Sequence, residues 1–152
     1  MLFQVVEAGE GIEGEILRGL RGYGGGREGR SGLACPALLV VSPQAAARGM
    51  ALPQCCRTVL LPGGMGGRGP LRAASAVSYG ASPRDSLTIS SRERGRLWAA
   101  LQREVVTVDG QVVERQEFPL ALAPGEEALS ALAAAGALLL LGVPPEELGR
   151  PR

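Results

Sequence analysis

The sequence predicts a single α/β domain over residues 1–152, with a mostly parallel sheet, an antiparallel β-hairpin addition and a C-terminal core helix. Three observations predict this fold class. Apolar β-prone runs alternate with short helical segments over about residues 1–80, and alternating polar and apolar residues follow over about 86–122. An alanine- and leucine-rich segment then fills about residues 125–142. The length of 152 residues suits one domain with one core.

The first half is predicted to consist of repeated β-α units. Residues 37–41 are an unbroken apolar run, which is typical of a parallel strand covered on both faces. Ser42 and Pro43 follow as an N-cap and a first helical residue. Residues 22–32 are rich in glycine and arginine and predict a loop. The expected strands are residues 2–6, 37–41, 58–61 and 76–79, and the expected helices are residues 15–20, residues 44–50 and a short one that opens at Pro70.

The second half changes in character after Gly80. Residues 86–90 alternate as an exposed edge strand does. Asp109-Gly110 is a favoured two-residue turn, so residues 97–108 and 111–122 are expected to form a hairpin. The last helix ends before Pro144. Together these elements predict a Rossmann-like three-layer domain.

The composition excludes several classes of function. Apolar residues make up 45% and charged residues 20% of the chain, with a net charge of +1, as in soluble globular proteins with no overall attraction to nucleic acid or membrane. The chain has no histidine, which excludes Ser-His-Asp, Cys-His and histidine-ligated zinc sites. The apolar run at residues 128–143 is shorter than the roughly 20 residues that span a bilayer. We see no signal peptide at the start of the chain.

The cysteines do not resemble a secreted disulfide framework. Cys35, Cys55 and Cys56 are odd in number and include a vicinal pair. They therefore predict a reduced cytoplasmic setting. A redox or thiol-metal site at Cys55-Cys56 would need Cys35 as its partner, so structural cysteines are the prediction.

Two glycine loops have the G-x-G-x-x-G spacing of a dinucleotide-binding turn. Residues 9–14 place Glu10 and Glu13 where a pyrophosphate would lie, and their like charge favours a plain turn. The second loop, residues 64–69, contains Gly64, Gly66 and Arg68 and lacks the lysine of a Walker A loop. Backbone amides and Arg68 make it a candidate anion site, with a flexible connection as the alternative.

The segment 124–148 resembles the end of the central ATP-binding domain of the Mur ligase family, which adds amino acids to peptidoglycan precursors. The resemblance rests on Gly125, Ala131-Leu132-Ala133-Ala134, Leu141-Gly142-Val143-Pro144 and Glu146-Glu147-Leu148, with Val77-Ser78-Tyr79-Gly80 upstream. It covers roughly residues 57–148 and implies a shared fold for that part.

The departures from the Mur ligase pattern argue against ligase activity. Where the family has His-Asn and then Asn beside the adenine of ATP, this chain has Glu126, Glu127 and Ser130. The family's phosphate-binding G-K-[ST] loop, magnesium-binding glutamate and carbamylated lysine have no counterpart, and the chain contains no lysine. The resemblance therefore implies a packed core helix without ligand contacts.

The densest set of polar groups is residues 79–86, just after a predicted parallel strand. Ligands bind at the carboxyl ends of such strands, so Tyr79, Ser82, Arg84 and Asp85 are candidate ligand-binding residues, with Arg84 for an anion. The alternative is a Ser-Pro-Arg-Asp turn in which Asp85 caps a backbone N–H.

Two further charged groups are predicted to be structural. Residues 102–104 and 114–117 carry arginines and glutamates that would pair across the hairpin. Arg92, Arg94 and Arg96 are expected in a solvated turn, with an RNA or phosphate contact as the alternative.

We therefore expect a non-catalytic cytoplasmic interaction or regulatory domain with no cofactor and no metal. It would bind a protein partner or a second copy of itself, and neither nucleic acid nor membrane. The alternative is a nucleotide- or anion-binding domain, with weak hydrolase or transferase activity, in which the 63–69 and 79–86 loops hold a phosphate-containing small molecule. The two hypotheses differ in whether Arg68 and Arg84 point to a common cavity.

Overall fold

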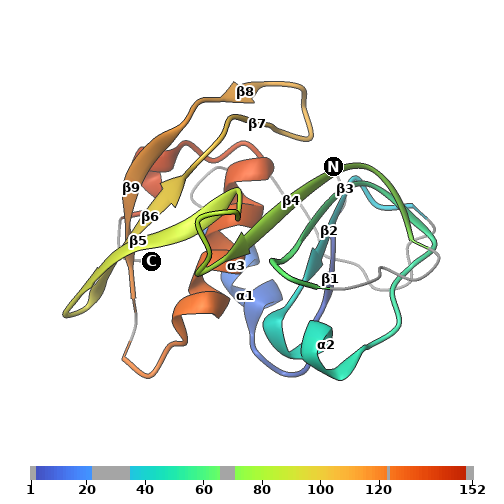
Figure 1. Cartoon of the computed structure of the whole chain (residues 1–152), viewed down its shortest axis with the longest axis horizontal. Helices are drawn as coiled ribbons and strands as arrows, with labels where there is room; N and C mark the ends of the chain where they lie inside the picture. The colour runs from blue at the N-terminus through green and yellow to red at the C-terminus, as the bar shows by residue number, and fades with distance from the viewer. Residues whose placement is uncertain (1–2, 22–34, 66–70, 123, 150–152) are drawn as a thin grey trace.

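A computed structural model of the chain describes residues 3–21, 35–65, 71–122 and 124–149 (Figure 1). The helices are α1 (Ile12–Arg21), α2 (Pro43–Arg48), α3 (Ala128–Leu140) and the 3-10 turn η1 (Pro145–Glu147). The strands are β1 (Phe3–Val6), β2 (Leu38–Val41), β3 (Cys55–Pro62), β4 (Arg72–Gly80), β5 (Leu87–Glu93), β6 (Arg96–Leu101), β7 (Val105–Val106), β8 (Val112–Val113) and β9 (Gln116–Ala121).

One seven-stranded sheet forms the centre of the fold, in the order β1-β2-β3-β4-β5-β6-β9. The strands from β1 to β5 pair in parallel, and β5, β6 and β9 pair antiparallel. The short strands β7 and β8 form a separate antiparallel pair. The predicted mostly parallel sheet with an antiparallel addition is therefore confirmed.

Helices cover both faces of the parallel part of the sheet, which makes three layers. Leu38 and Val40 of β2 face α1 and α3, whereas Leu39 and Val41 face α2 in a second, smaller core cluster. Because successive strand residues point to opposite faces, a strand covered on both sides needs an unbroken apolar run. This is the physical reason for the run at residues 37–41.

Helix α3 lies at the centre of the larger core. Eleven of its thirteen residues are buried, so it is apolar on all sides instead of amphipathic. In Figure 1 it stands between strands β1–β4 on one side and β5, β6 and β9 on the other. Small residues allow close packing: a Cβ on Gly136 would lie 3.1 Å from the side chains of Leu60 and Leu87. None of the helices in the described ranges is both long and apolar enough to cross a bilayer.

The structure corrects the predicted helix after Pro70. The chain is already in β4 at Arg72, four residues before the predicted strand start at 76. Strand β4 pairs with β3 from Cys55↔Arg72 to Pro62↔Tyr79. These pairings with a neighbouring strand outweigh the helix propensity of the alanines in the RAASAVSYG segment.

Strand β5 is only partly the predicted edge. Its first residues, Leu87 and Thr88, pair with β4 on one side and β6 on the other. Beyond them, pairing with β6 alone continues, and the last four residues are exposed. The strand therefore starts inside the sheet and ends at an edge.

The predicted hairpin forms but is split in two. Asp109-Gly110 makes the turn, with Gly110 at a φ of 88° and its N–H donating to Thr107 O at 2.9 Å. The split arises near Val108, which is buried and donates its N–H to Leu140 O at the end of α3 over 2.9 Å. That bond ties the β7–β8 hairpin to α3, while β6 and β9 stay in the main sheet.

Candidate functional site

The described parts of the two predicted loops meet at one end of β3 and β4. Gly63 N–H donates to Tyr79 O at 2.8 Å, and Gly64 turns the chain with a φ of 76°. The Asp85 carboxylate lies directly against both backbones: a Cβ on Gly63 would be 1.8 Å from its Oδ1, and one on Gly80 would be 2.5 Å from its Oδ2. Gly66 and Arg68 lie outside the described residues.

Asp85 holds the 80–86 turn closed. It is buried, and its carboxylate accepts the N–H of Ser82 at 3.1 Å, while Ser82 Oγ accepts the N–H of Arg84 at 3.1 Å. Gln102 Nε2 donates to the carbonyls of Pro83 and Asp85, each at 2.9 Å. Polar groups of Ser82 and Asp85 are therefore used within the turn, and the Arg84 side chain is exposed.

Tyr79 belongs to the core and not to a ligand-facing surface. Its side chain is fully buried, and its hydroxyl donates to Val41 O at 2.6 Å. Burial raises the pKa of Tyr79 above its ordinary value, and the negative charge of Glu10 raises it further. The hydroxyl therefore stays protonated and links β4 to the end of β2.

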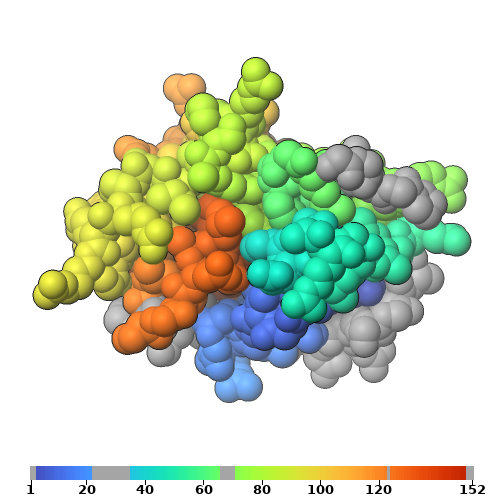
Figure 2. Space-filling model, turned by 60° about the horizontal axis from the view of Figure 1, so that its bottom comes forward, coloured from blue at the N-terminus to red at the C-terminus, as the bar shows by residue number. Residues whose placement is uncertain are grey.

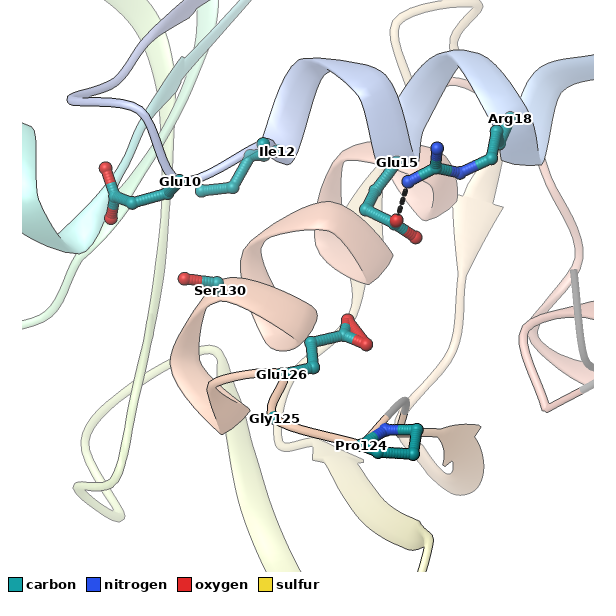
Figure 3. Close-up of a pocket in the computed structure, with 9 residues that line it drawn as sticks. Glu10, Ile12, Glu15, Arg18, Pro124, Gly125, Glu126 and Ser130 are labelled. Carbon is teal, nitrogen blue, oxygen red and sulfur yellow. Dashed lines mark hydrogen bonds and ion pairs between the residues drawn. The ribbon is translucent and has the colours of Figure 1, made fainter.

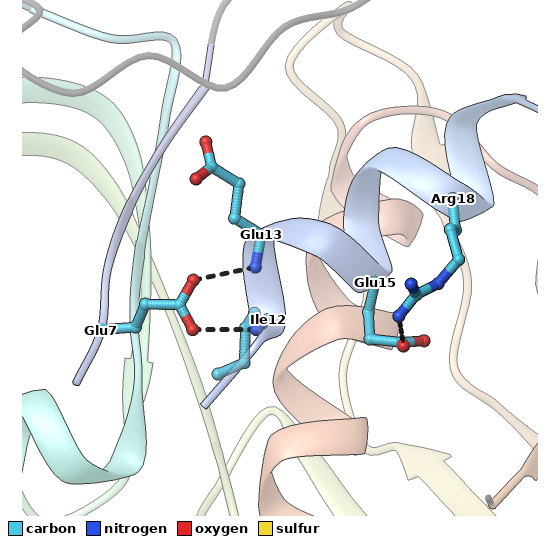
Figure 4. Close-up of polar contacts among 5 residues, drawn as sticks. All are labelled: Glu7, Ile12, Glu13, Glu15 and Arg18. Carbon is cyan, nitrogen blue, oxygen red and sulfur yellow. Dashed lines mark hydrogen bonds and ion pairs between the residues drawn. The ribbon is translucent and has the colours of Figure 1, made fainter. Parts of the chain in front are cut away.

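In the first glycine loop, residues 9–14, the Glu7 side chain occupies the position that a phosphate would take. Gly9 and Gly11 both have a φ of 78°, and the loop enters α1 (Figure 4). The two carboxylate oxygens of Glu7 accept the N–H groups of Ile12 at 2.8 Å and of Glu13 at 3.0 Å. These amides at a helix N-terminus are the groups that bind phosphate in dinucleotide-binding turns. Glu7 was missed because its role depends on the loop folding back onto it.

The Glu10 carboxylate likewise accepts a backbone N–H group at the N-terminus of α2. Its carboxylate accepts the N–H groups of Ala8 and Gln44, both at 3.0 Å, and the hydroxyl of Ser42. Ser42 Oγ accepts the N–H of Ala45 at 2.9 Å, which confirms its predicted N-cap role. Burial acts to raise the pKa of Glu10, but these hydrogen bonds and the charge of Arg48 outweigh it, so the pKa lies below its ordinary value.

We expect Glu10 to make stability depend on pH. Its pKa is lower in the folded protein than the ordinary value of 4.5, so its stabilising contribution is complete above that value and is lost as the pH falls through the lowered pKa. Urea unfolding at a series of pH values from about 7 to about 3 should show a shallower loss of stability in Glu10→Gln than in the unmodified protein. Glu114→Gln, at an exposed position, is the control and should lose stability with falling pH as steeply as the unmodified protein does. An equal dependence of the unfolding free energy on pH in both variants would exclude this role of Glu10.

A cleft of about 350 Å³ lies between α1 and the start of α3. Figure 3 shows Glu126 and Ser130 of the α3 side across from Glu15 and Arg18 of α1, which form an ion pair. On the outer surface, the orange segment that leads into α3 borders the blue residues of α1 (Figure 2). Glu10 also lines the cleft, so three carboxylates and one guanidinium surround it. That balance of charge disfavours a phosphate.

The predicted Arg–Glu pairs across the hairpin do not form as expected. The register places Ala100 opposite Glu117, and the Glu117 carboxylate accepts the hydroxyl of Ser90 on β5. Arg103 donates to Arg84 O at 2.9 Å instead. Arg92, Arg94 and Arg96 are exposed, as predicted, but only Arg94 lies in the turn, because Arg92 belongs to β5 and Arg96 to β6. Within the described ranges, no three cysteine or carboxylate side chains group as metal ligands.

Comparison of the chain with protein-family models gives no match, and comparison with curated protein sequences gives no significant match.

Proposed function

We propose that this chain is a non-catalytic cytoplasmic α/β domain with an interaction or regulatory role. The observation that carries the proposal is the occupation of helix N-termini by the chain's own carboxylates: Glu7 at α1 and Glu10 at α2. An enzyme of this fold class that handles nucleotides would leave those amides open to phosphate. Here a carboxylate takes the place of the phosphate and repels a second anion.

A descent from a Mur-ligase-like fold is part of the proposal. Parallel strands, then antiparallel strands, then a core helix follow the order that the resemblance implies. Glu126 and Ser130, at positions where the family contacts adenine, line a cleft rich in carboxylates. The order of the elements supports the shared fold, and the carboxylates support the loss of nucleotide binding at the start of α3.

The proposed contact surface is the β7–β8 hairpin, which exposes apolar side chains. Val106 and Val112 are opposite one another in the hairpin and are 52% and 57% exposed. Beside them, a groove of about 410 Å³ separates the hairpin from the end of α3, lined in part by Val113, Leu139 and Val143. Exposed apolar groups next to a groove are typical of protein contact surfaces.

We propose a second copy of the chain as the partner. Each hairpin strand pairs with one strand in the described part of the chain, so its other side can accept a strand from another molecule. A pairing of two such hairpins about a two-fold axis would also cover both valines of each copy. The near-neutral net charge of +1 puts no strong repulsion between two copies.

Val112→Asp is expected to weaken self-association at least tenfold, because a carboxylate would have to lose its water at the contact. Light scattering coupled to size-exclusion chromatography over a range of concentrations measures the mass. Met50→Asp is the matched control, since Met50 is an exposed apolar side chain (37%) after α2, away from the hairpin. It should associate as the unmodified protein does.

Two results would contradict the proposal. Equal weakening by Val112→Asp and Met50→Asp would remove the hairpin as the contact, and a monomer at all concentrations would remove the second copy as the partner. A nucleotide or phosphate that raises the melting temperature, through binding to the folded state alone, would favour the alternative anion-binding role at the 63–69 and 79–86 loops.

A further inference from the structure

Cys35 and Cys55 lie side by side at the amino-terminal ends of β2 and β3. The parallel register pairs Leu38 with Thr58. Before this pair, Thr58 N–H donates to Ala37 O at 3.1 Å and Arg57 N–H to Pro36 O at 3.0 Å, so the chain that leads into β2 runs beside the start of β3. Two successive N–H groups of β3 donate toward β2 here, which interrupts the regular register, and at this point the Cys35 and Cys55 thiols share a hydrogen bond. Two thiols in hydrogen-bond contact need only a small side-chain movement to reach the geometry of a disulfide.

The third cysteine is separated from this pair by the sheet. Cys56 is buried in the core cluster on the α2 side, with Val59 and Leu61. Since successive residues of a strand point to opposite faces, the Cys55 side chain points away from that cluster. The vicinal pair therefore divides into one buried structural thiol and one thiol that meets Cys35.

The surroundings of the pair give its members different roles. Cys35 is exposed and Cys55 is half-buried. A hydrogen bond with the Cys35 thiol raises the pKa of Cys55, burial and the charge of Cys35 raise it further, and the positive charge of Arg72 acts in the opposite direction. Arg72 is the register partner of Cys55 on β4, so this positive charge belongs to the strand beside Cys55.

We propose that Cys35 and Cys55 form a redox-active dithiol that exchanges with small-molecule disulfides to give an intramolecular disulfide. In the first step the Cys35 thiolate attacks one sulfur of the small disulfide, whose S–S bond breaks and releases one thiolate. The Cys55 thiol then gives its proton to that thiolate and attacks Cys35 Sγ in the mixed disulfide, which releases the second thiolate. This thiolate takes up from water the proton that Cys35 lost on ionising. The protein loses two electrons and two protons, and the small disulfide becomes two thiols.

The roles within the exchange follow from access and position. Cys35 is the entry cysteine because it is exposed, whereas Cys55 is placed against it and resolves the mixed disulfide. The bridge would join β2 to β3 at the end of the sheet where Arg72 begins β4. This inference does not rest on the proposed interaction role, since it uses a different end of the sheet from the β7–β8 hairpin.

Oxidised glutathione is the probe for the test. The reduced protein is incubated with it, quenched with acid and analysed by intact mass and by non-reducing peptide mapping. We expect the loss of two hydrogen atoms, a peptide that links Cys35 to Cys55, and a Cys56 thiol that stays reduced. Cys56→Ser is the matched control and should form the same bridge.

Variants in which one cysteine is replaced separate the two steps. Cys55→Ser should stop at one glutathione on Cys35, and Cys35→Ser should lose bridge formation and almost all glutathione uptake. The melting temperature of each variant in its reduced form shows whether it is folded, so a loss of exchange in a folded variant reports on chemistry. Glutathione uptake without bridging in the unmodified protein, a bridge to Cys56, or a disulfide between two chains would each overturn the proposal.

Discussion

Leu138→Ala is expected to lower the free energy of unfolding by about 3 kcal/mol. Leu138 is 1% exposed and lies in α3, where it packs against α1 within the larger core. The contact is close because α1 has Gly19 at this point: a Cβ there would lie 2.5 Å from Leu138 Cδ1 and 2.8 Å from Cδ2. Removing the leucine leaves a cavity that two packed helices cannot close completely. Urea unfolding followed by circular dichroism measures the change.

A double-mutant cycle tests the reason for this cost. Gly19→Ala alone should destabilise the protein, because the new methyl group overlaps Leu138. In the Leu138→Ala background the same change should be neutral or stabilising, since alanine is favoured over glycine in a helix by about 1 kcal/mol. Additive effects of the two substitutions would show that α1 and α3 do not pack as described.

Gly63→Ala is expected to cost about 2 kcal/mol, the effect of overpacking a filled site. A methyl group at Gly63 would overlap the Asp85 carboxylate, 1.8 Å from its Oδ1. Asp85 has little room to move, because it is 4% exposed and is hydrogen-bonded to Ser82 N–H. The cost arises from space alone, since Gly63 has no positive φ. Thermal and urea unfolding report it.

Asp85→Ala is the test of that mechanism. It should itself destabilise the turn, since Ser82 N–H loses its acceptor, but Gly63→Ala should then add little further cost. Gly14→Ala is the matched control, because a Cβ at Gly14 in α1 meets no atom within 4 Å. A full cost of Gly63→Ala in the Asp85→Ala background would mean that something other than the carboxylate opposes the methyl group.

Much of the fold is contained in local patterns of the sequence. The apolar run at 37–41 predicted a strand covered on both faces, Ser42 with Pro43 predicted the start of α2, and Asp109-Gly110 predicted a turn. A closing core helix was predicted at about residues 125–142, and α3 confirms it at Ala128–Leu140, with burial on all sides. Each of these features depends on residues within a few positions of one another.

The candidate site was less accessible to such reasoning. Tyr79 was expected near a ligand, but it bonds Val41, which is 38 residues away. Asp85 was expected either near a ligand or as the cap of a backbone N–H in a turn, and the structure confirms the turn. Its position beside Gly63 and Gly80 was not predicted. Glu7 showed no sequence signal at all. These roles depend on which segments of the chain come into contact, and the residue types alone do not specify those contacts.

Local preferences and chain length thus determined the fold class and the turns. The long-range register of the sheet determined the rest: β4 as a strand where alanines favoured a helix, the carboxylates at the N-termini of α1 and α2, and the meeting of Cys35 with Cys55. The physical reason is that strand pairing and core packing bring together residues distant in sequence, and they can outweigh helix propensities of only a few tenths of a kcal/mol per residue.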